Sequence, residues 1–254
     1  MGGTASILHG ILSPRINQRG NDEGGRWSWF EINGKNNRVL CIISAYRVCK
    51  QSTDTSGDNT AWRLQERYLI SKGILNPDPR QQMLKELQNF IQTKQEKKRD
   101  IFLLMDANEE ITPTKTKYPP LHKFMTDCGL MHCMQSAYPD APLPVTYVRG
   151  RKCIDHIMMS PQLINTIRLC GTLPAGFGYE SDHRLIYCDL DLGEYLGGKH
   201  SDETNLTSRV LQKSRLQVWT NYQTKLRELY TYHRIYEKSG EIYQIHWFSY
   251  HKKR

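Results

Sequence analysis

The sequence has no long hydrophobic run. Its longest, Ile101 to Met105, is far shorter than the roughly 18 apolar residues that a membrane-spanning helix needs. The N-terminal residues contain no basic segment followed by an apolar one, so no signal peptide is expected. Together these absences favour an intracellular protein that does not contact a membrane. The nucleus is one compartment in which it could reside.

Paired cysteines are also lacking. The 254-residue chain has seven cysteines, an odd number, and none of them stands in a C-x-x-C motif. Four stand among aliphatic residues, where a free thiol acts as a small hydrophobe: Cys41, Cys153, Cys170 and Cys188. Cys128, His132 and Cys133 are close enough in sequence for a metal cluster, but a fourth ligand is missing, so a buried helix end is favoured. We therefore expect a reducing compartment.

Acidic residues are too few to balance the basic ones. The net charge is +9, which favours a polyanionic partner. From residue 199 to residue 254 the chain has 11 Lys or Arg and 5 Asp or Glu, so this tail carries most of the excess. Such a tail is either a solvated surface or a contact for nucleic acid, and the sequence does not choose between them. Apolar residues at helical spacing predict that it is helical: Leu211, Val218, Tyr222, Leu226 and Leu229.

The remaining sequence alternates between strand-like and helix-like segments and contains no internal repeat. Strands are expected at residues 4–12, 27–34, 37–46, 101–106, 152–160 and 183–192, and helices at 59–73, from Pro79 onward and at 121–128. The Asn33-Gly34 pair between two apolar runs predicts a hairpin turn, and Asn59 is the expected N-cap of the first helix. We predict an α/β fold with mixed sheets for residues 1–195, followed by a basic helical tail or linker over residues 199–254.

Polar residues stand at four boundaries of the predicted strands. They are Tyr46, Asp106, Asn108, Asp155 and the adjacent pair Asp182 and His183. If the later strands run antiparallel to the earlier ones, the end of one strand meets the start of another at the same edge of the sheet. Each residue also has an ordinary alternative, because D-x-N and S-D-H sequences often form turns and a tyrosine often fills a core.

Asp155 weakens the ordinary alternative. A carboxylate inside an apolar strand needs a partner that offsets its desolvation, and His183 is the natural one. An aspartate bonded to one imidazole nitrogen leaves the other nitrogen free to accept a proton. We therefore expect these boundary residues to lie together in one site.

These motifs, taken in chain order, carry a family resemblance. Tyr46, "MDAN" (105–108), "CIDH" (153–156) and "SDH" (181–183) resemble the later motifs of the endonuclease/exonuclease/phosphatase superfamily of metal-dependent phosphodiesterases. The resemblance spans roughly Gly2 to Leu192 and implies a four-layered α/β sandwich.

A narrower resemblance is to the retroelement-type members. "GGT", "GRWSW" and "SAYRVC" are similar to segments of those endonucleases, and "TNYQTKLRELYTYHRIYEKSGEI" is similar to the start of their helical link to a reverse transcriptase. The partners that it implies are nucleic acid, DNA before RNA, and a reverse transcriptase encoded downstream.

The superfamily resemblance implies a role for each site residue. His183 would deprotonate the attacking water, and Asp155 would orient His183. Asp106 would assist the leaving oxygen, Asn108 would hold a phosphate oxygen, and Tyr46 would donate a hydrogen bond to the phosphate. Such donors suit a reaction that concentrates negative charge on phosphoryl oxygens.

The implied cofactor is a divalent cation, Mg²⁺ or Mn²⁺, with Asp182 as a ligand. Mg²⁺ keeps much of its water, so few protein ligands are required. In the family, a motif centred on an Asn and another centred on a metal-binding Glu precede "GGT", and this chain has neither. Glu109 or Glu110 would replace that Glu only if the loop after "MDAN" folded back. We therefore expect an incomplete sandwich with part of the site.

Three functions stay open from the sequence. The first is a nuclease, favoured by the basic tail and the retroelement-like segments. The second is a phosphatase of the same superfamily that acts on phosphoinositides or other small phosphate esters. The third is a nucleic-acid-binding module whose catalytic site has decayed.

Overall fold

The computed structural model describes residues 3–8, 10–50, 57, 59–176 and 181–197, and seven positions between 220 and 231. The chain divides into two compact units, Met1–His200 and Ser201–Arg254. The described positions of the second unit are helical, whereas the five apolar positions on which the predicted tail helix rests lie outside the described residues.

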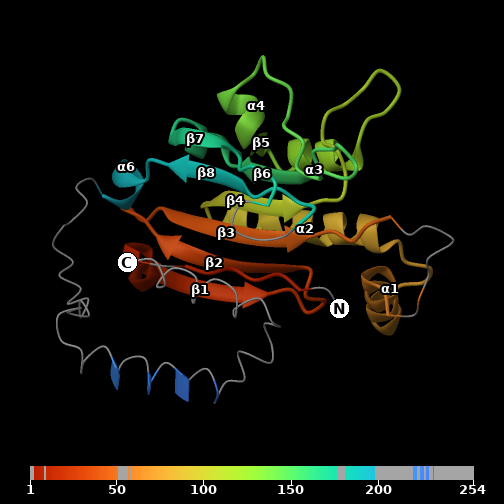
Figure 1. The fold of residues 1–254 in the computed structure, drawn as a ribbon, viewed down its shortest axis with the longest axis horizontal. Coiled ribbons are helices and arrows are strands. Elements are labelled where there is room, and N and C mark those ends of the chain that lie inside the picture. The colour runs from red at the N-terminus through yellow and green to blue at the C-terminus, as the bar shows by residue number, and fades with distance from the viewer. Residues whose placement is uncertain are drawn as a thin grey trace, which may run out of the picture. The chain divides into compact units, whose positions relative to one another are not determined.

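The first unit is built on a six-stranded sheet (Figure 1). Its strands lie in the order β1 (Ile16–Asn21), β2 (Trp27–Asn33), β3 (Val39–Tyr46), β4 (Arg99–Asp106), β6 (Asp155–Met159) and β5 (Met131–His132). β3 and β4 are parallel, and the other neighbouring pairs are antiparallel. The ends of β3 and β4 and the start of β6 therefore meet at one edge of the sheet.

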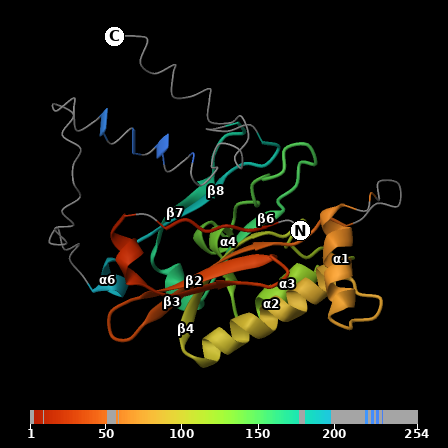
Figure 2. The same ribbon diagram turned by 90° about the horizontal axis from the view of Figure 1, so that it is seen from below.

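Two helices, α2 (Pro79–Glu96) and α3 (Pro120–Asp127), cover one face of this sheet. A third helix, α1 (Ala61–Ser71), packs against α2. Met83, Leu87 and Ile91 recur at helical spacing on α2, are fully buried and belong to the same hydrophobic core as Ile43 and Leu103 of the sheet. Figure 2 shows α2 running along the sheet beside β4. The parallel β3–β4 pair requires such a crossover, and α1 and α2 provide it.

A second, two-stranded sheet packs on the opposite face. It consists of β7 (Ile167–Thr172) and β8 (Ile186–Leu190), which are antiparallel. The short helices η1 (Gly10–Arg15), α4 (Cys133–Ala137), α5 (Pro161–Ile164) and α6 (Gly193–Leu196) complete the described elements. Phe102 and Ile157 of the main sheet share a core with Cys170 of β7 and Tyr195 of α6. Two cores on two faces of a mixed sheet confirm the predicted α/β fold.

Most predicted elements are present with shifted ends. The β2–β3 hairpin is confirmed, but its turn is longer than two residues, since Gly34 N–H donates to Arg38 O and both Asn36 and Asn37 have positive φ. The helix predicted from residue 59 is capped by Thr60, whose side chain accepts from Arg63 N–H.

One strand prediction is wrong. Residues 4–8 have no regular structure, residues 10–15 form a 3-10 helix that contains Pro14, and the first strand begins at Ile16. The apolar residues of segment 4–12 suggested a strand there. The actual first strand, β1, was missed because it is a polar edge strand, mostly exposed, without apolar alternation. The sequence did not predict β5 or β7 either. β5 has only two residues, and the side chains of β7 are largely half-buried or exposed.

Within the described residues, no helix combines the length and hydrophobicity that crossing a membrane requires.

Candidate active site

Three of the predicted site residues form one row across the main sheet. Tyr46, the last residue of β3, is the register partner of Asp106, the last residue of β4. Asp106 is in turn the register partner of Asp155, the first residue of β6. Because directly opposed residues point to the same face of a sheet, the three side chains start from one side of one edge.

His183 joins this row from the loop before β8. Its Nδ1 lies 3.0 Å from Oδ2 of Asp155 and 3.2 Å from Oδ1. A carboxylate only accepts, so Nδ1 is the donor of this hydrogen bond, and Nε2 is the ring nitrogen that does not contact Asp155. The His183 side chain remains 29% exposed, whereas that of Asp155 is 13% exposed. The pair thus has the orientation that the sequence predicted.

A neighbouring loop holds the His183 loop in place. Residues 147 and 183 form an antiparallel bridge, and Arg184 N–H donates to Thr146 O at 2.7 Å. The Tyr147 ring also lies beside the imidazole, with 5.3 Å between ring centroids. The buried hydroxyl of Thr146 accepts from the backbone N–H groups of Ile154 and Asp155. Thr146 therefore positions both members of the His183–Asp155 pair.

Asn108 lies in a tight turn directly after β4. Its φ is 48°, in the left-handed region that asparagine tolerates better than most residues. Its backbone N–H donates to Oδ1 of Asp106 at 3.1 Å, and its side-chain amide donates to Arg47 O at 2.9 Å. The Cys49 thiol donates to its Oδ1 at 3.0 Å. The turn therefore fixes the Asn108 amide beside Asp106.

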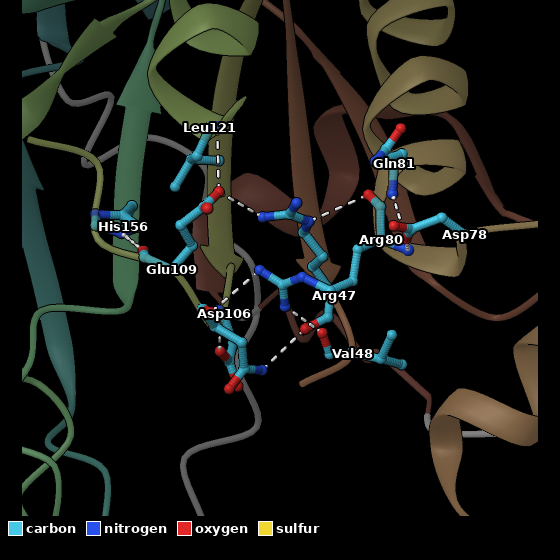
Figure 3. A network of polar contacts seen from close by, with 10 residues as sticks. Arg47, Val48, Asp78, Arg80, Gln81, Asp106, Glu109, Leu121 and His156 are labelled. Carbon is cyan, nitrogen blue, oxygen red and sulfur yellow. Dashed lines mark hydrogen bonds and ion pairs between the residues drawn. The ribbon is translucent and has the colours of Figure 1, made fainter. Parts of the chain in front are cut away.

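Two buried arginines support this turn from behind, as Figure 3 shows. Arg47 pairs with the Glu109 carboxylate at 2.7 Å, and its Nε donates to Arg80 O at 3.2 Å. The Arg80 guanidinium donates to the backbone carbonyls of Val48 and Asn108. Both arginines are nearly inaccessible to solvent. They join the ends of β3 and β4 to the start of α2.

Glu109 is held away from the predicted cation. In Figure 3 its carboxylate points toward Arg47 and toward the backbone N–H of Leu121, which donates at 3.3 Å. Its carbonyl oxygen accepts from His156 Nε2 at 2.8 Å. Glu110 lines a separate cavity of about 230 Å³ together with Cys153. The loop therefore does not fold back in the way that replacing the family's Glu would require.

Burial sets the protonation of the site. It raises the pKa of Asp106 to about 6, with the nearby Asp155 charge adding to the effect and His183 and Arg80 opposing it. Burial also raises the pKa of Tyr46 to about 12, helped by Cys49 and Asp106. Tyr46 is therefore a neutral hydroxyl donor at neutral pH. Asp106 is a carboxylate whose ionised form is costly without a nearby cation.

One group in the described part of the chain could hold a metal ion. It consists of Asp106, Asp155 and His183, whose ligand atoms all lie within 4.8 Å of one another. Carboxylate oxygens are the ligands that Mg²⁺ and Mn²⁺ prefer, and a cation would favour the ionised form of Asp106, which burial and the Asp155 charge disfavour. The chemistry of these residues therefore fits a divalent cation.

Asp182, the predicted ligand, is not part of this group. Its carboxylate lies 3.5 Å from Nε of Arg149, it is 37% exposed, and its carbonyl accepts from Val148 N–H. Its assignment to the cation stays a prediction. Asp106, Asp155 and His183 are brought together, with Tyr46 and Asn108 attached to Asp106 through register and hydrogen bonding.

Sequence reasoning missed the supporting residues. Arg47 and Arg80 contact Asn108 from distant parts of the sequence, and Thr146 contacts Asp155 from the loop before β6. Arg47 follows Tyr46 directly and could have been suspected from that position alone. Arg80 follows the helix-starting Pro79, and Thr146 lies in a loop, so neither has a local signal that points to the site.

Comparisons with known proteins concern the fold. No family model matches the chain, and neither does any curated protein. An AP endonuclease from Archaeoglobus fulgidus is similar with a TM-score of 0.48 and 14% identity, over 69% of this chain and 71% of that one. The 3′ phosphatase NExo from Neisseria, solved with a product DNA hairpin, has a TM-score of 0.47 and 14% identity, over 67% of this chain and 66% of that one.

The endonuclease domain of TRAS1, a telomere-specific non-LTR retrotransposon, is similar with a TM-score of 0.39 and 14% identity, over 66% of this chain and 64% of that one. The chain thus spans about two thirds of each of these proteins. Two of these proteins are named as endonucleases and one as a 3′ phosphatase.

Proposed function

We propose that this chain hydrolyses phosphodiester bonds in nucleic acid, DNA in the first place, as a member of the endonuclease/exonuclease/phosphatase superfamily. The observation that carries the proposal is the contact of His183 Nδ1 with the Asp155 carboxylate beside Asp106. This hydrogen-bonded pair keeps its imidazole partly open to solvent, since the His183 side chain is 29% exposed.

His183 is the general base in this proposal. Asp155 accepts from Nδ1 and so fixes the tautomer in which Nε2 can take a proton from water. The Tyr147 ring and the Thr146 carbonyl hold the loop that carries the imidazole. The base is thereby oriented before the substrate arrives, which lowers the entropic cost of the reaction.

Asp106, Tyr46 and Asn108 are the groups that face the phosphate. Tyr46 offers a neutral hydroxyl. Asn108 uses one amide hydrogen on Arg47 O, and its second can reach a phosphoryl oxygen. Asp106 assists the leaving oxygen in this proposal, as the family resemblance implies.

Asp106 and Asp155 would hold the divalent cation, Mg²⁺ or Mn²⁺, with Asp182 as the further ligand that the family resemblance implies. When bound, the cation would neutralise charge that develops on the phosphoryl oxygens. The net charge of +9 favours a polyanionic substrate. The retroelement type and a downstream reverse transcriptase are proposed from "GGT", "GRWSW", "SAYRVC" and the tail sequence. We also propose residues 1–195 as the hydrolase domain and residues 199–254 as its basic tail.

A plasmid-nicking assay tests the proposal. Supercoiled plasmid is incubated with Mg²⁺ and wild-type protein, Asp155→Asn, or the matched control Asp140→Asn, which changes an exposed aspartate outside the site. We expect nicking by the wild type and the control, loss with Asp155→Asn, and loss on chelation of the metal.

Other outcomes would point to another function. Equal nicking by Asp155→Asn would mean that another site or a contaminant cuts the plasmid. Salt-sensitive DNA binding without nicking would favour the binding module. Turnover of small phosphate esters alone would favour the phosphatase.

A further inference from the structure

Three cysteines gather between the two sheets, away from the row of site residues. Cys133 begins α4, Cys170 lies on β7, and Cys188 lies on β8 as the register partner of Cys170. Sγ of Cys133 lies 3.3 Å from Sγ of Cys188, and all three thiols are free. The contact joins residues that are 55 positions apart in the chain.

The three thiols differ in accessibility and in proton affinity. Cys133 and Cys170 are buried, whereas Cys188 is half-buried. The Cys133 thiol donates to Cys188, and this hydrogen bond lowers the pKa of Cys188 against the opposing effects of burial and Asp189. The same contact and burial raise the pKa of Cys133. The more accessible sulfur is thus also the one that loses its proton first.

The other four cysteines lie in different surroundings. Cys41 and Cys128 are buried in the core between the sheet and the helices, where burial raises the pKa of each to about 12. Cys49 and Cys153 donate to oxygen atoms, the side-chain oxygen of Asn108 and the carbonyl of Asp155. The 3.3 Å contact is therefore a feature of this cluster and not of cysteine burial in general.

We propose that Cys188 and Cys133 form a modification site at which a low-molecular-weight disulfide, such as oxidised glutathione, introduces a reversible disulfide bond. The Cys188 thiolate attacks one sulfur of the oxidant, which forms a mixed disulfide and releases one thiolate. Cys133 then loses its proton to solvent and attacks the Cys188 sulfur, which releases the second thiolate. Two protein thiols are oxidised, and one molecule of glutathione disulfide is reduced to two thiols.

The bond would join α4 to β8, and hence the helix that follows β5 of the main sheet to the two-stranded sheet. The inference does not depend on the proposed function, because neither cysteine belongs to the candidate active site. A cross-link between distant positions restricts the unfolded chain, so the oxidised protein should melt at a higher temperature than the reduced protein.

Peptide mapping of the wild-type protein tests the proposal directly. The folded protein is equilibrated in glutathione buffers of increasing oxidised fraction, quenched in acid, alkylated and digested. We expect a peptide pair linked through Cys133 and Cys188 that dithiothreitol removes. A folded protein that keeps both thiols free in oxidised glutathione would overturn the proposal, as would a bond between Cys170 and Cys188.

Variants test the order of the two steps. Cys133→Ser should trap glutathione on Cys188 as a stable mixed disulfide, whereas Cys188→Ser should leave Cys133 without an adduct. Cys170→Ser is the matched control from the same cluster and should form the bond as the wild type does. An adduct on Cys133 in Cys188→Ser would show that the assignment of the attacking thiol is wrong.

Discussion

Asp155 and His156 are neighbours on β6, and each belongs to a different kind of histidine pair. Asp155 binds Nδ1 of His183, and the His183 side chain is 29% exposed. His156 binds His132 at 3.2 Å, and these two residues are 0% and 3% exposed. Successive residues of a strand point to opposite faces, so one step along the chain separates the two pairs.

In the buried pair, hydrogen bonds occupy all four ring nitrogens. Glu109 O accepts from His156 Nε2, so His156 Nδ1 must accept from His132 Nε2. His132 Nδ1 in turn accepts from Gln135 N–H at 3.3 Å. Burial lowers the pKa of both rings, that of His132 to about 3. A saturated, neutral pair of this kind stabilises structure, whereas the Asp155–His183 pair has the arrangement that the proposed general base requires.

The largest expected effect separates the two pairs by activity. His183→Ala should lower the rate of nicking about 10²- to 10⁴-fold, because it removes the proposed general base. Its free energy of unfolding should change by no more than about 1 kcal/mol, since the His183 side chain is partly exposed. Nicking rates and urea denaturation of the same preparation measure both quantities. A large loss of stability with unchanged activity would reverse the comparison.

A substitution in the buried His132–His156 pair should, by contrast, lower the stability of the protein. His156→Leu leaves Glu109 O and His132 Nε2 without their partner, and we expect a loss of about 1–3 kcal/mol in the free energy of unfolding. Urea denaturation measures the loss, with His122→Leu as a control at a histidine outside both pairs. A change within the error of the control would mean that water replaces the lost hydrogen bonds.

Ionised Asp106 should lower the free energy of unfolding at neutral pH. Its folded pKa of about 6 lies above the ordinary value of 3.8, so its contribution to stability is present at low pH and is lost as the pH rises through 6. At pH 7 and without divalent cation, Asp106→Asn should therefore stabilise the protein by about 1–2 kcal/mol while lowering activity. Asp140→Asn should do neither. A destabilised Asp106→Asn would contradict the pKa direction.

The buried His132–His156 pair also predicts a pH dependence of stability. His132 has a folded pKa of about 3 against an ordinary value of 6.5, and the pKa of His156 is also lowered. The unfolded chain therefore binds more protons, and stability should fall as the pH drops below about 6.5. Each ring contributes about 1.4 kcal/mol per pH unit at most. Urea denaturation between pH 7 and pH 5 measures the slope, which His156→Leu should reduce.

The sequence predicted much of the fold where burial leaves a clear pattern. β2 alternates, β4 is a continuous apolar run, and α2 has apolar residues at helical spacing; the structure contains all three. The prediction failed at β1 and β7, whose side chains are mostly exposed or half-buried. An edge strand gains its hydrogen bonds from a neighbour rather than from its own side chains, so its sequence carries little signal.

Some features of the candidate site were likewise predictable from the sequence and others were not. The sequence by itself determined its chemical groups, because Tyr46, Asp106, Asn108, Asp155 and His183 stand at strand boundaries and pair acid with base. Only the tertiary structure decided that Tyr46, Asp106 and Asp155 lie in one register row, and that Arg47, Arg80 and Thr146 hold the site together. The physical reason is that strand register, a parallel crossover and loop packing bring together residues as far apart in the chain as Asp106 and His183, and no local pattern encodes such contacts.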